Sequence, residues 1–359
     1  MAYTTIDDPS KYFHVRLYSG TGSSQAITNN ANAGDFQPDW IWIKNRSDDA
    51  GHPIFDSSRG VNKNLTVNVD DAESTVTTQV TAFGSNGFTV GNNNGANGSS
   101  DNLVAFQWKC NGGTTSATVA EEDYALYSPA NVRQTNTEAG FSIITYTGTG
   151  SAGQIQHGLG AVPAWIITKQ RSNAENWAVY HHKNTAAAPT DYLLLNTTNS
   201  TTDNSNRWND EAPNTNVFTV GSANEVNTDD RTYVAYVFAE KQGYSKFGTY
   251  EGNGNTDGTF VYTGFKPAWL MIKRSGGGGN AWGIYDSARA PNNEITMNID
   301  ADRADAENTA TNYDDLDFLS NGFKLYELND DINASDTYVY MAFAEHPFVS
   351  SKGVPTTAR

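Results

Sequence analysis

The stretch Pro38-Asp-Trp40-Ile-Trp-Ile-Lys44 has two close copies further along the chain, at residues 163–169 and 267–273. These copies read Pro-Ala-Trp-Ile-Ile-Thr-Lys and Pro-Ala-Trp-Leu-Met-Ile-Lys. Apolar side chains at successive positions after the tryptophan are typical of a strand that is covered on both faces. The lysine that ends each copy predicts the point at which the strand re-enters solvent. We interpret the three copies as equivalent strands whose tryptophans belong to the core: Trp40, Trp165 and Trp269.

Further landmarks surround each copy in the same order. A stretch that ends in Gly-Xaa-Gly precedes it, as in Tyr146-Thr-Gly-Thr-Gly150, and a second apolar strand closes the unit. The first and third units also share an interior motif, because Ile54-Phe-Asp-Ser-Ser-Arg59 matches Ile284-Tyr-Asp-Ser-Ala-Arg289. The closing strands are Leu103–Trp108, Tyr233–Ala239 and Tyr338–Ala344. Ordered self-similarity of this kind indicates an internal repeat.

The predicted fold is all-β, with three tandem β-sandwich repeats of the jelly-roll or concanavalin-like type. Each repeat has on the order of 100 residues, which suits a sandwich and is too long for a solenoid turn. Glycine- and asparagine-rich turns separate the apolar stretches, and no segment keeps a helical period. We expect the repeats at residues 1–112, 140–243 and 244–359, the last with a C-terminal tail. The polar residues 113–139 are predicted to form a linker or docking strap.

The chain is acidic, with 40 Asp and Glu against 23 Lys and Arg and a formal net charge of -17. Nucleic-acid binding needs basic side chains to contact phosphates, so we do not expect a nucleic-acid partner. The sequence contains no apolar run of about 18 residues, the length that a membrane-spanning helix requires. The opening residues Met1–Pro9 have neither the basic nor the apolar region of a signal peptide. We therefore expect no membrane insertion.

Motifs for catalysis or metal binding are not evident. The six histidines show no zinc-ligand spacing, and we expect structural or surface roles for them. Asp56 and Arg59 recur as Asp286 and Arg289, but the middle repeat has Tyr180-His181-His182 at the corresponding place. A reaction carried by the repeat should not vanish from one copy, so a local ion pair or turn cap is the favoured interpretation. We predict that the protein is not an enzyme, has no catalytic residues and needs no cofactor.

Three other features of the sequence are candidates for a site. The acidic stretch Asp300-Ala-Asp302-Arg-Ala-Asp305 could hold calcium, but Asp305 stands where an EF-hand loop needs glycine, and a solvated acidic surface is favoured. Trp208 lies among polar residues and has no clear counterpart in the other repeats. It is the leading candidate for an exposed contact with a glycan or a partner. Cys110, the single cysteine, is predicted to be a free thiol without a functional role.

Several of these motifs together resemble a repeat family of tailed bacteriophages, particularly marine ones. The resemblance covers nearly the whole chain, although the first repeat has Gln107-Trp-Lys109 where the others have Phe-Ala-Glu. It rests on Tyr146–Gly150, Pro163–Lys169, Phe238–Glu240, Ser245–Tyr250, Phe260–Trp269, Phe318–Leu325 and Tyr340–Glu345. It implies a concanavalin-like or jelly-roll sandwich in a virion protein. The family offers no catalytic residues to carry over.

Within this resemblance, the expected function is that of a structural protein on the capsid surface, a decoration or cement protein. Such a protein is made in the host bacterial cytoplasm and contacts the major capsid protein or tail proteins. The alternative is a tail-fibre or spike module that binds host-surface glycans. Sheet edges with few guarding lysines favour a homo-oligomer, most simply a trimer on a symmetry axis. Residues 113–139 and the tail Ser350–Arg359 are expected to make its contacts.

Overall fold

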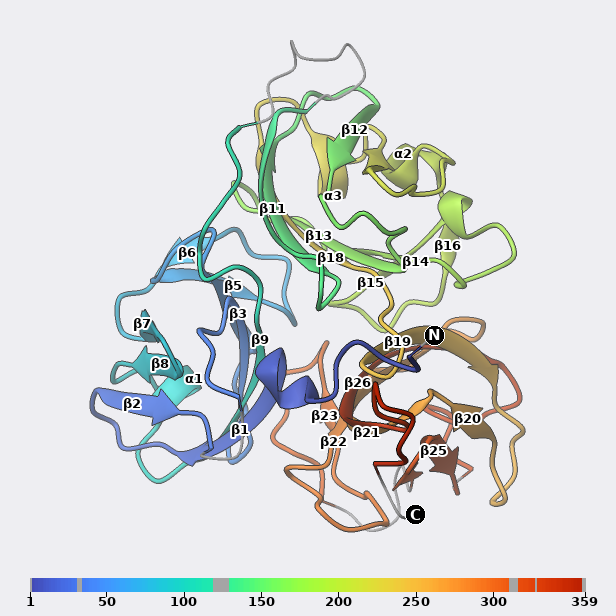
Figure 1. The fold of residues 1–359 in the computed structure, drawn as a ribbon. Coiled ribbons are helices and arrows are strands. Elements are labelled where there is room, and N and C mark those ends of the chain that lie inside the picture. Colours follow the sequence, from blue (N-terminus) through green and yellow to red (C-terminus); the bar gives the residue numbers. More distant parts are fainter. Residues whose placement is uncertain (1, 31–33, 119–128, 310–315, 327, 357–359) are drawn as a thin grey trace.

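The computed structural model describes residues 2–30, 34–118, 129–309, 316–326 and 328–356. It is an all-β fold of antiparallel sheets, with a few helices of one turn. Figure 1 shows the strands gathered into three units around a common centre. We refer to residues 13–108 as unit 1, residues 131–238 as unit 2 and residues 245–347 as unit 3.

Each unit contains one large sheet. In unit 1 its order is β1 (Phe13–Ser19), β9 (Asn102–Trp108), β3 (Trp40–Asn45), β4 (Pro53–Asp56), β5 (Lys63–Thr66) and β6 (Ser74–Thr75). In unit 2 it is β10 (Asn131–Asn136), β11 (Phe141–Thr147), β18 (Thr232–Phe238), β13 (Trp165–Gln170), β14 (Ala178–His181), β15 (Asp191–Leu194) and β16 (Thr202–Asp203). In unit 3 it is β19 (Ser245–Glu251), β26 (Thr337–Pro347), β21 (Phe265–Arg274), β22 (Trp282–Asp286) and β23 (Ile299–Asp300).

A small sheet covers one face of each large sheet. The small sheets are β2 (Gln25–Thr28), β8 (Gly87–Val90) and β7 (Val80–Gly84) in unit 1; β12 (Gly153–Gln156) and β17 (Val217–Val220) in unit 2; and β20 (Phe260–Tyr262), β25 (Gly322–Leu325) and β24 (Leu316–Leu319) in unit 3. The described ranges contain the short helices η1 (Pro9–Lys11), α1 (Asn94–Asn97), η3 (Ala188–Thr190), α2 (Ser205–Trp208) and α3 (Asn224–Asn227).

The strand that carries the repeated tryptophan has the same neighbours in all three units. It lies between the closing strand and the next strand of the chain, as in β9-β3-β4, β18-β13-β14 and β26-β21-β22. The register is also the same, because the tryptophan pairs across the sheet with an aromatic residue of the closing strand. These pairs are Trp40 with Trp108, Trp165 with Phe238, and Trp269 with Phe343.

The two faces of these strands are covered by different parts of the molecule. In β3, Ile41 and Ile43 face the small sheet of their own unit, where they pack with Phe88. The alternate residues Trp40 and Trp42 belong to a central core that all three units share. The expected burial of both faces of the strand is confirmed. The small sheet covers one face, and the neighbouring units cover the face that carries the tryptophans.

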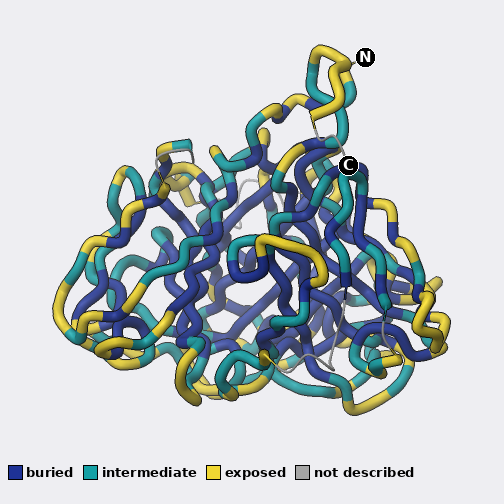
Figure 2. Tube along the Cα trace, turned by 90° about the horizontal axis from the view of Figure 1, so that it is seen from below, coloured by how far each residue is buried: buried dark blue, intermediate teal, exposed yellow. Residues whose placement is uncertain are grey.

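The central core is built largely from aromatic rings that meet across unit boundaries. Trp40 of unit 1 stacks on Tyr236 of unit 2, with 4.5 Å between ring centroids. Phe13 of unit 1 stacks on Phe343 of unit 3 at 5.1 Å. Figure 2 shows the buried backbone concentrated in the middle of the molecule. Because rings from all three units interdigitate there, each unit completes the core of the other two.

The predicted linker contributes a strand to unit 2. Within residues 113–139, β10 pairs with β11 as the edge of the large sheet, while residues 119–128 lie outside the described part of the chain. Gln134 on β10 also connects the first two units. Its Oε1 accepts hydrogen bonds from the backbone of Asn111 and Gly113 at 2.8 Å, and its Nε2 donates to Ser57 Oγ at 2.9 Å.

Figure 2 places both ends of the chain on the same side of the molecule. Ser351 donates its backbone N–H to Asp7 Oδ1 at 2.6 Å, which joins the predicted tail to the N-terminal segment. Residues 357–359 of that tail lie outside the described ranges.

Candidate functional site: the junctions between units

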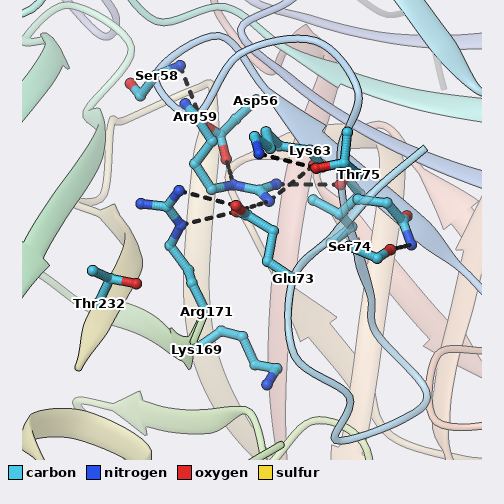
Figure 3. A network of polar contacts seen from close by, with 12 residues as sticks. Asp56, Ser58, Arg59, Lys63, Glu73, Ser74, Thr75, Lys169, Arg171 and Thr232 are labelled. Atoms are coloured by element: carbon cyan, nitrogen blue, oxygen red, sulfur yellow. Dashed lines mark hydrogen bonds and ion pairs between the residues drawn. The ribbon is translucent and has the colours of Figure 1, made fainter. Parts of the chain in front are cut away.

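The repeated aspartate and arginine of unit 1 lie at its junction with unit 2 (Figure 3). Asp56 is the last residue of β4, and its Oδ1 accepts backbone N–H bonds from Ser58 at 3.1 Å and Arg59 at 2.8 Å. Its other oxygen contacts Arg59 Nε and accepts a hydrogen bond from Tyr236 of unit 2 at 2.7 Å. The predicted ion pair and turn cap are therefore both present, and both side chains are fully buried.

Glu73 extends this network into unit 2. It accepts hydrogen bonds from Arg59 at 3.0 Å and from Arg171 of unit 2 at 2.8 and 3.0 Å. Burial acts to raise the pKa of Glu73, but the hydrogen bond from Arg171 and the charge of Arg59 outweigh it, and the pKa is lowered. One carboxylate thus bridges two guanidinium groups from different units (Figure 3).

The junction between unit 3 and unit 1 repeats this arrangement. Asp286 Oδ1 accepts the backbone N–H of Arg289 at 2.8 Å, and its Oδ2 contacts Arg289 Nε. Arg289 donates to Glu307 at 2.9 Å. Glu307 also accepts hydrogen bonds from Arg46 of unit 1, from Nε at 3.0 and 3.1 Å and from Nη2 at 2.7 Å.

The junction between unit 2 and unit 3 has the same backbone geometry, but neutral side chains stand where the other junctions carry the aspartate, the glutamate and the two arginines. Thr201 donates its N–H to the Ser275 carbonyl at 3.1 Å, as Glu73 does to Arg171 and Glu307 to Arg46. Its hydroxyl bonds to Asn184 Oδ1 at 2.7 Å. His181 pairs with Trp165 across β13 and β14, in the register at which Asp56 pairs with Trp40. The first junction has four charged residues: Asp56, Arg59, Glu73 and Arg171. Their places are taken here by four neutral residues: His181, Asn184, Thr201 and Ser275.

The lysines that end the tryptophan strands also lie in these junctions. Lys44 donates to the carbonyl of Ala304 at 2.6 Å, Lys169 to that of Asp70 at 3.0 Å, and Lys273 to that of Thr198 at 2.8 Å. Each acceptor belongs to the neighbouring unit. Burial lowers the pKa of all three lysines to about 8. The expectation that they mark a return to solvent was wrong, because the next unit covers the strand end.

A buried ring lies beside each lysine and contacts the same neighbouring loop. Trp177 donates its indole N–H to the carbonyl of Val69 at 3.2 Å, and Trp282 donates to that of Leu194 at 2.9 Å. Unit 1 has His52 at this place, and its Nδ1 accepts the indole N–H of Trp42 at 3.0 Å. Burial lowers the pKa of His52 well below its ordinary value.

The carboxylates of the charged junctions are committed to arginine side chains. Asp56, Glu73, Asp286 and Glu307 each contact at least one guanidinium group. A glycosidase-type reaction needs one carboxylic acid and one carboxylate facing a substrate. The side chains of Asp56 and Asp286 have no exposed surface, so this geometry stabilises unit contacts instead.

In the acidic stretch Asp300–Asp305, the candidate for calcium binding, two of the carboxylates contact groups of the protein itself. Asp302 Oδ1 accepts the backbone N–H of Trp282 at 2.8 Å, and Asp300 lies 3.5 Å from Arg303. Burial raises the pKa of Asp300 to about 7. Within the described ranges, no group of three or more histidine, cysteine or acidic side chains is placed to hold a metal ion.

Trp208 occupies a position that the sequence did not predict. Only 1 % of its surface is exposed, and its ring packs edge-on against Tyr180 at 5.8 Å between centroids. Asn204 caps helix α2 by accepting the N–H of Asn206, so the polar neighbours serve the helix end while the tryptophan turns inward. The expected exposed ring is therefore not observed.

Cys110 is a buried free thiol, in agreement with the prediction about its bonding. Its Sγ lies 3.4 Å from the carbonyl oxygen of Phe141, and burial raises its pKa well above the ordinary value. Among the described residues, no helix is long and apolar enough to cross a membrane.

Sequence reasoning found the Asp–Arg pairs but missed their bridging glutamates and the buried lysines. The signal was available, because Lys44-Asn-Arg46 and Lys169-Gln-Arg171 repeat the same spacing at the strand ends. The glutamates were harder to find, since each lies in a loop 14 or 18 residues after its own arginine and its second arginine belongs to the adjacent unit.

Of the comparisons with known proteins, only the one with protein families finds a match. No curated protein and no solved structure matches the chain. The family described as a domain of unknown function, DUF7483, matches residues 8–347, which include strands of all three units. The chain belongs to the DUF7483 family.

Proposed function

We propose that the protein is a structural component of a tailed-phage virion, displayed on the particle surface as a capsid decoration or cement protein. The observation that carries the proposal is that the buried ion pairs join one unit to the next. Asp56, Arg59, Glu73 and their counterparts lie in the unit junctions, where they fix three units into one body. Such a body suits a load-bearing role, and the resemblance to phage repeat proteins supplies the setting.

We further propose that the three units are tandem β-sandwich repeats of the jelly-roll or concanavalin-like type. The shared strand order and the shared register of Trp40, Trp165 and Trp269 support this interpretation. The repeats would then be modules of one particle protein that is made in the host cytoplasm and binds the major capsid protein or tail proteins.

Self-association is part of the same proposal. At a net charge of -17, copies repel one another, so a homo-oligomer such as a trimer must rest on specific contacts. Residues 350–356 lie beside the N-terminal segment on one side of the molecule, where they could bind a capsid or another copy. Deleting residues 350–359 should then lower occupancy on particles.

A glycan-binding tail-fibre or spike module is the second candidate. The observation that favours it is an exposed pair of aromatic side chains on unit 3, Phe260 and Tyr262. The two candidates differ in where the protein lies on the particle and in whether a saccharide competes for it.

The deciding experiment is immunogold labelling of intact particles with antibodies against the purified chain. Label spread over the head supports decoration, and label confined to the tail supports the fibre module. Absence of label from particles that contain the chain by mass spectrometry would contradict surface display. Incubation with capsular polysaccharide should release no reducing ends, and sustained hydrolysis would contradict the non-enzymatic role.

A further inference from the structure

Two aromatic side chains on unit 3 are unusually exposed. Phe260 is 44 % exposed and Tyr262 is 53 % exposed, and no other aromatic side chain in the described part of the chain is exposed to a similar degree. Both project from the outer face of β20, whereas Val261 between them points into the core of unit 3. Two exposed aromatic side chains on one face of a strand make this surface a candidate for contact with a ligand.

The corresponding positions in the other units carry no aromatic residue. Val261 pairs with Phe323 in the way that Ile27 pairs with Phe88 and Ile155 with Phe218. The residues directly before and after Val261, Ile27 and Ile155 are therefore equivalent across the three units, and their side chains point away from the core. They are Phe260 and Tyr262 in unit 3, Ala26 and Thr28 in unit 1, and Gln154 and Gln156 in unit 2. The strand itself does not need aromatic residues at these positions, so their presence is specific to unit 3.

Both rings are held in place by their surroundings. Phe260 packs over the backbone of Gly322, where an added Cβ would lie 3.2 Å from its Cε2 atom. The Tyr262 hydroxyl lies 3.3 Å from the hydroxyl of Tyr3, which donates to the Gly264 carbonyl at 2.7 Å. Fixed rings lose little conformational freedom when a ligand stacks on them.

A hollow of about 430 Å³ lies beside Tyr262. Its lining includes Tyr3, Glu240, Gln242, Ser245 and Lys246, which together offer hydrogen-bond donors and acceptors. Lys246 and Glu240 form an ion pair at 2.9 Å, so the charges within the hollow are balanced. Ligand sites combine an aromatic wall with a few polar groups that fix orientation, and this hollow has both.

We propose that Phe260, Tyr262 and this hollow form a saccharide-binding site. The apolar C–H face of a pyranose ring would stack on the exposed aromatic rings. Its hydroxyl groups, which both donate and accept hydrogen bonds, would bind Glu240, Gln242 and Lys246. The inference concerns a ligand site that a purely structural protein would not need, and it holds for a head or a tail location.

A protein partner fits these features less well. The core of a protein interface is depleted of charged residues, whereas the hollow next to Tyr262 holds Glu240 and Lys246. A second copy that paired with the free edge of β20 would use backbone groups and leave the hollow unused. The saccharide accounts for the rings and the polar hollow together.

The test uses the full chain, an array of purified bacterial lipopolysaccharides and capsular polysaccharides, and the double variant Phe260→Ala/Tyr262→Thr. This variant gives unit 3 the pair that unit 1 carries naturally, so the strand should still form. We expect the parent chain to bind at least one saccharide, and the variant to lose on the order of tenfold in affinity, or about 1.4 kcal/mol. Gln242→Ala should weaken binding without changing the rings.

The matched control is Gln154→Ala/Gln156→Thr in unit 2, which should bind as the parent does. Thermal unfolding and mass by light scattering are measured for every variant. Binding of no saccharide, or equal binding by Phe260→Ala/Tyr262→Thr, would overturn the proposal. So would a fall in oligomer mass in that variant with saccharide binding unchanged, because the patch would then join copies of the chain. Surface display could survive each of these outcomes, since particle labelling tests it separately.

Discussion

At the scale of single residues, charge is used to join units. Glu73 and Glu307 each bridge two arginines, one from their own unit and one from the next. A buried ion pair gives little net stability over apolar residues, but removing one partner leaves an uncompensated charge. Substitutions at these residues should therefore be costly.

We expect Glu73→Gln and Glu307→Gln each to lower the free energy of unfolding by about 3 kcal/mol, because one buried and one half-buried guanidinium group lose their shared carboxylate. Thr201→Val, at the equivalent place in the neutral junction, removes one hydrogen bond and should cost about 1 kcal/mol. Urea unfolding at neutral pH measures all three variants. Equal losses at the charged and neutral junctions would contradict the role assigned to Glu73.

His52 makes stability depend on pH. The folded chain holds this histidine neutral because burial lowers its pKa well below 6.5, whereas the unfolded chain protonates it near 6.5. As pH falls below 6.5, the unfolded state binds the extra proton first, and the free energy of unfolding decreases. His52→Gln keeps an acceptor for Trp42 and should reduce this decrease. Urea unfolding of both proteins between pH 7 and about 5 tests the difference, and parallel profiles would argue against His52.

At the scale of elements, each tryptophan strand separates two cores. Ile41 belongs to the core inside unit 1, and Trp40 on the opposite face belongs to the shared centre. Short helices complete the unit cores, as α2 does by placing Trp208 under the small sheet of unit 2. The packing role of such residues follows from their position on the element.

Trp208→Ala should lower the free energy of unfolding by about 3 to 5 kcal/mol, because it opens a cavity in the core of unit 2. Saccharide binding, measured below the unfolding transition, should not change. A variant that kept its stability but lost binding would restore Trp208 as a contact residue.

Much of the strand arrangement could be predicted from the sequence, because Trp40, Trp165 and Trp269 recur with the same surroundings. The match of Asp56 with Asp286, and its absence at His181, also follows from the repeat. The cover of the tryptophan faces could not be predicted, since an apolar strand shows that it is buried without showing which element covers it. An alignment of the three units at Val261 is enough to show that Phe260 and Tyr262 have no aromatic counterparts. The burial of Trp208 depends on how helix α2 packs, and the polar residues around Trp208 in the sequence give no sign of it.

At the scale of the whole molecule, the three units share one core. Rings of unit 1, unit 2 and unit 3 meet at Trp40, Phe238 and Phe343, so no unit can bury its tryptophan face alone. This differs from a string of independent domains, in which each domain keeps its own core.

The chain should consequently unfold in one cooperative transition, with equal calorimetric and van't Hoff enthalpies. Residues 129–243 produced alone should expose Trp165 and Trp177, bind a hydrophobic dye and fail to form a stable monomer. Calorimetry and light scattering test both statements. Three separate transitions, or a stable isolated unit, would show that the shared core is dispensable.

The neutral junction between unit 2 and unit 3 also fixes which unit stands next to which. If the loop with Glu73 docked on the strand end that carries Ser275, its carboxylate would lose both hydrogen bonds from Arg171 and keep only Arg59 of its own unit. If the loop with Thr201 docked beside Arg171 or Arg46, a half-buried arginine would lack its carboxylate. Crowded copies of repeat proteins can exchange units during folding. Because the junctions differ in charge, a wrong pairing of units is less stable than the native one, and one cyclic order of the three units is favoured.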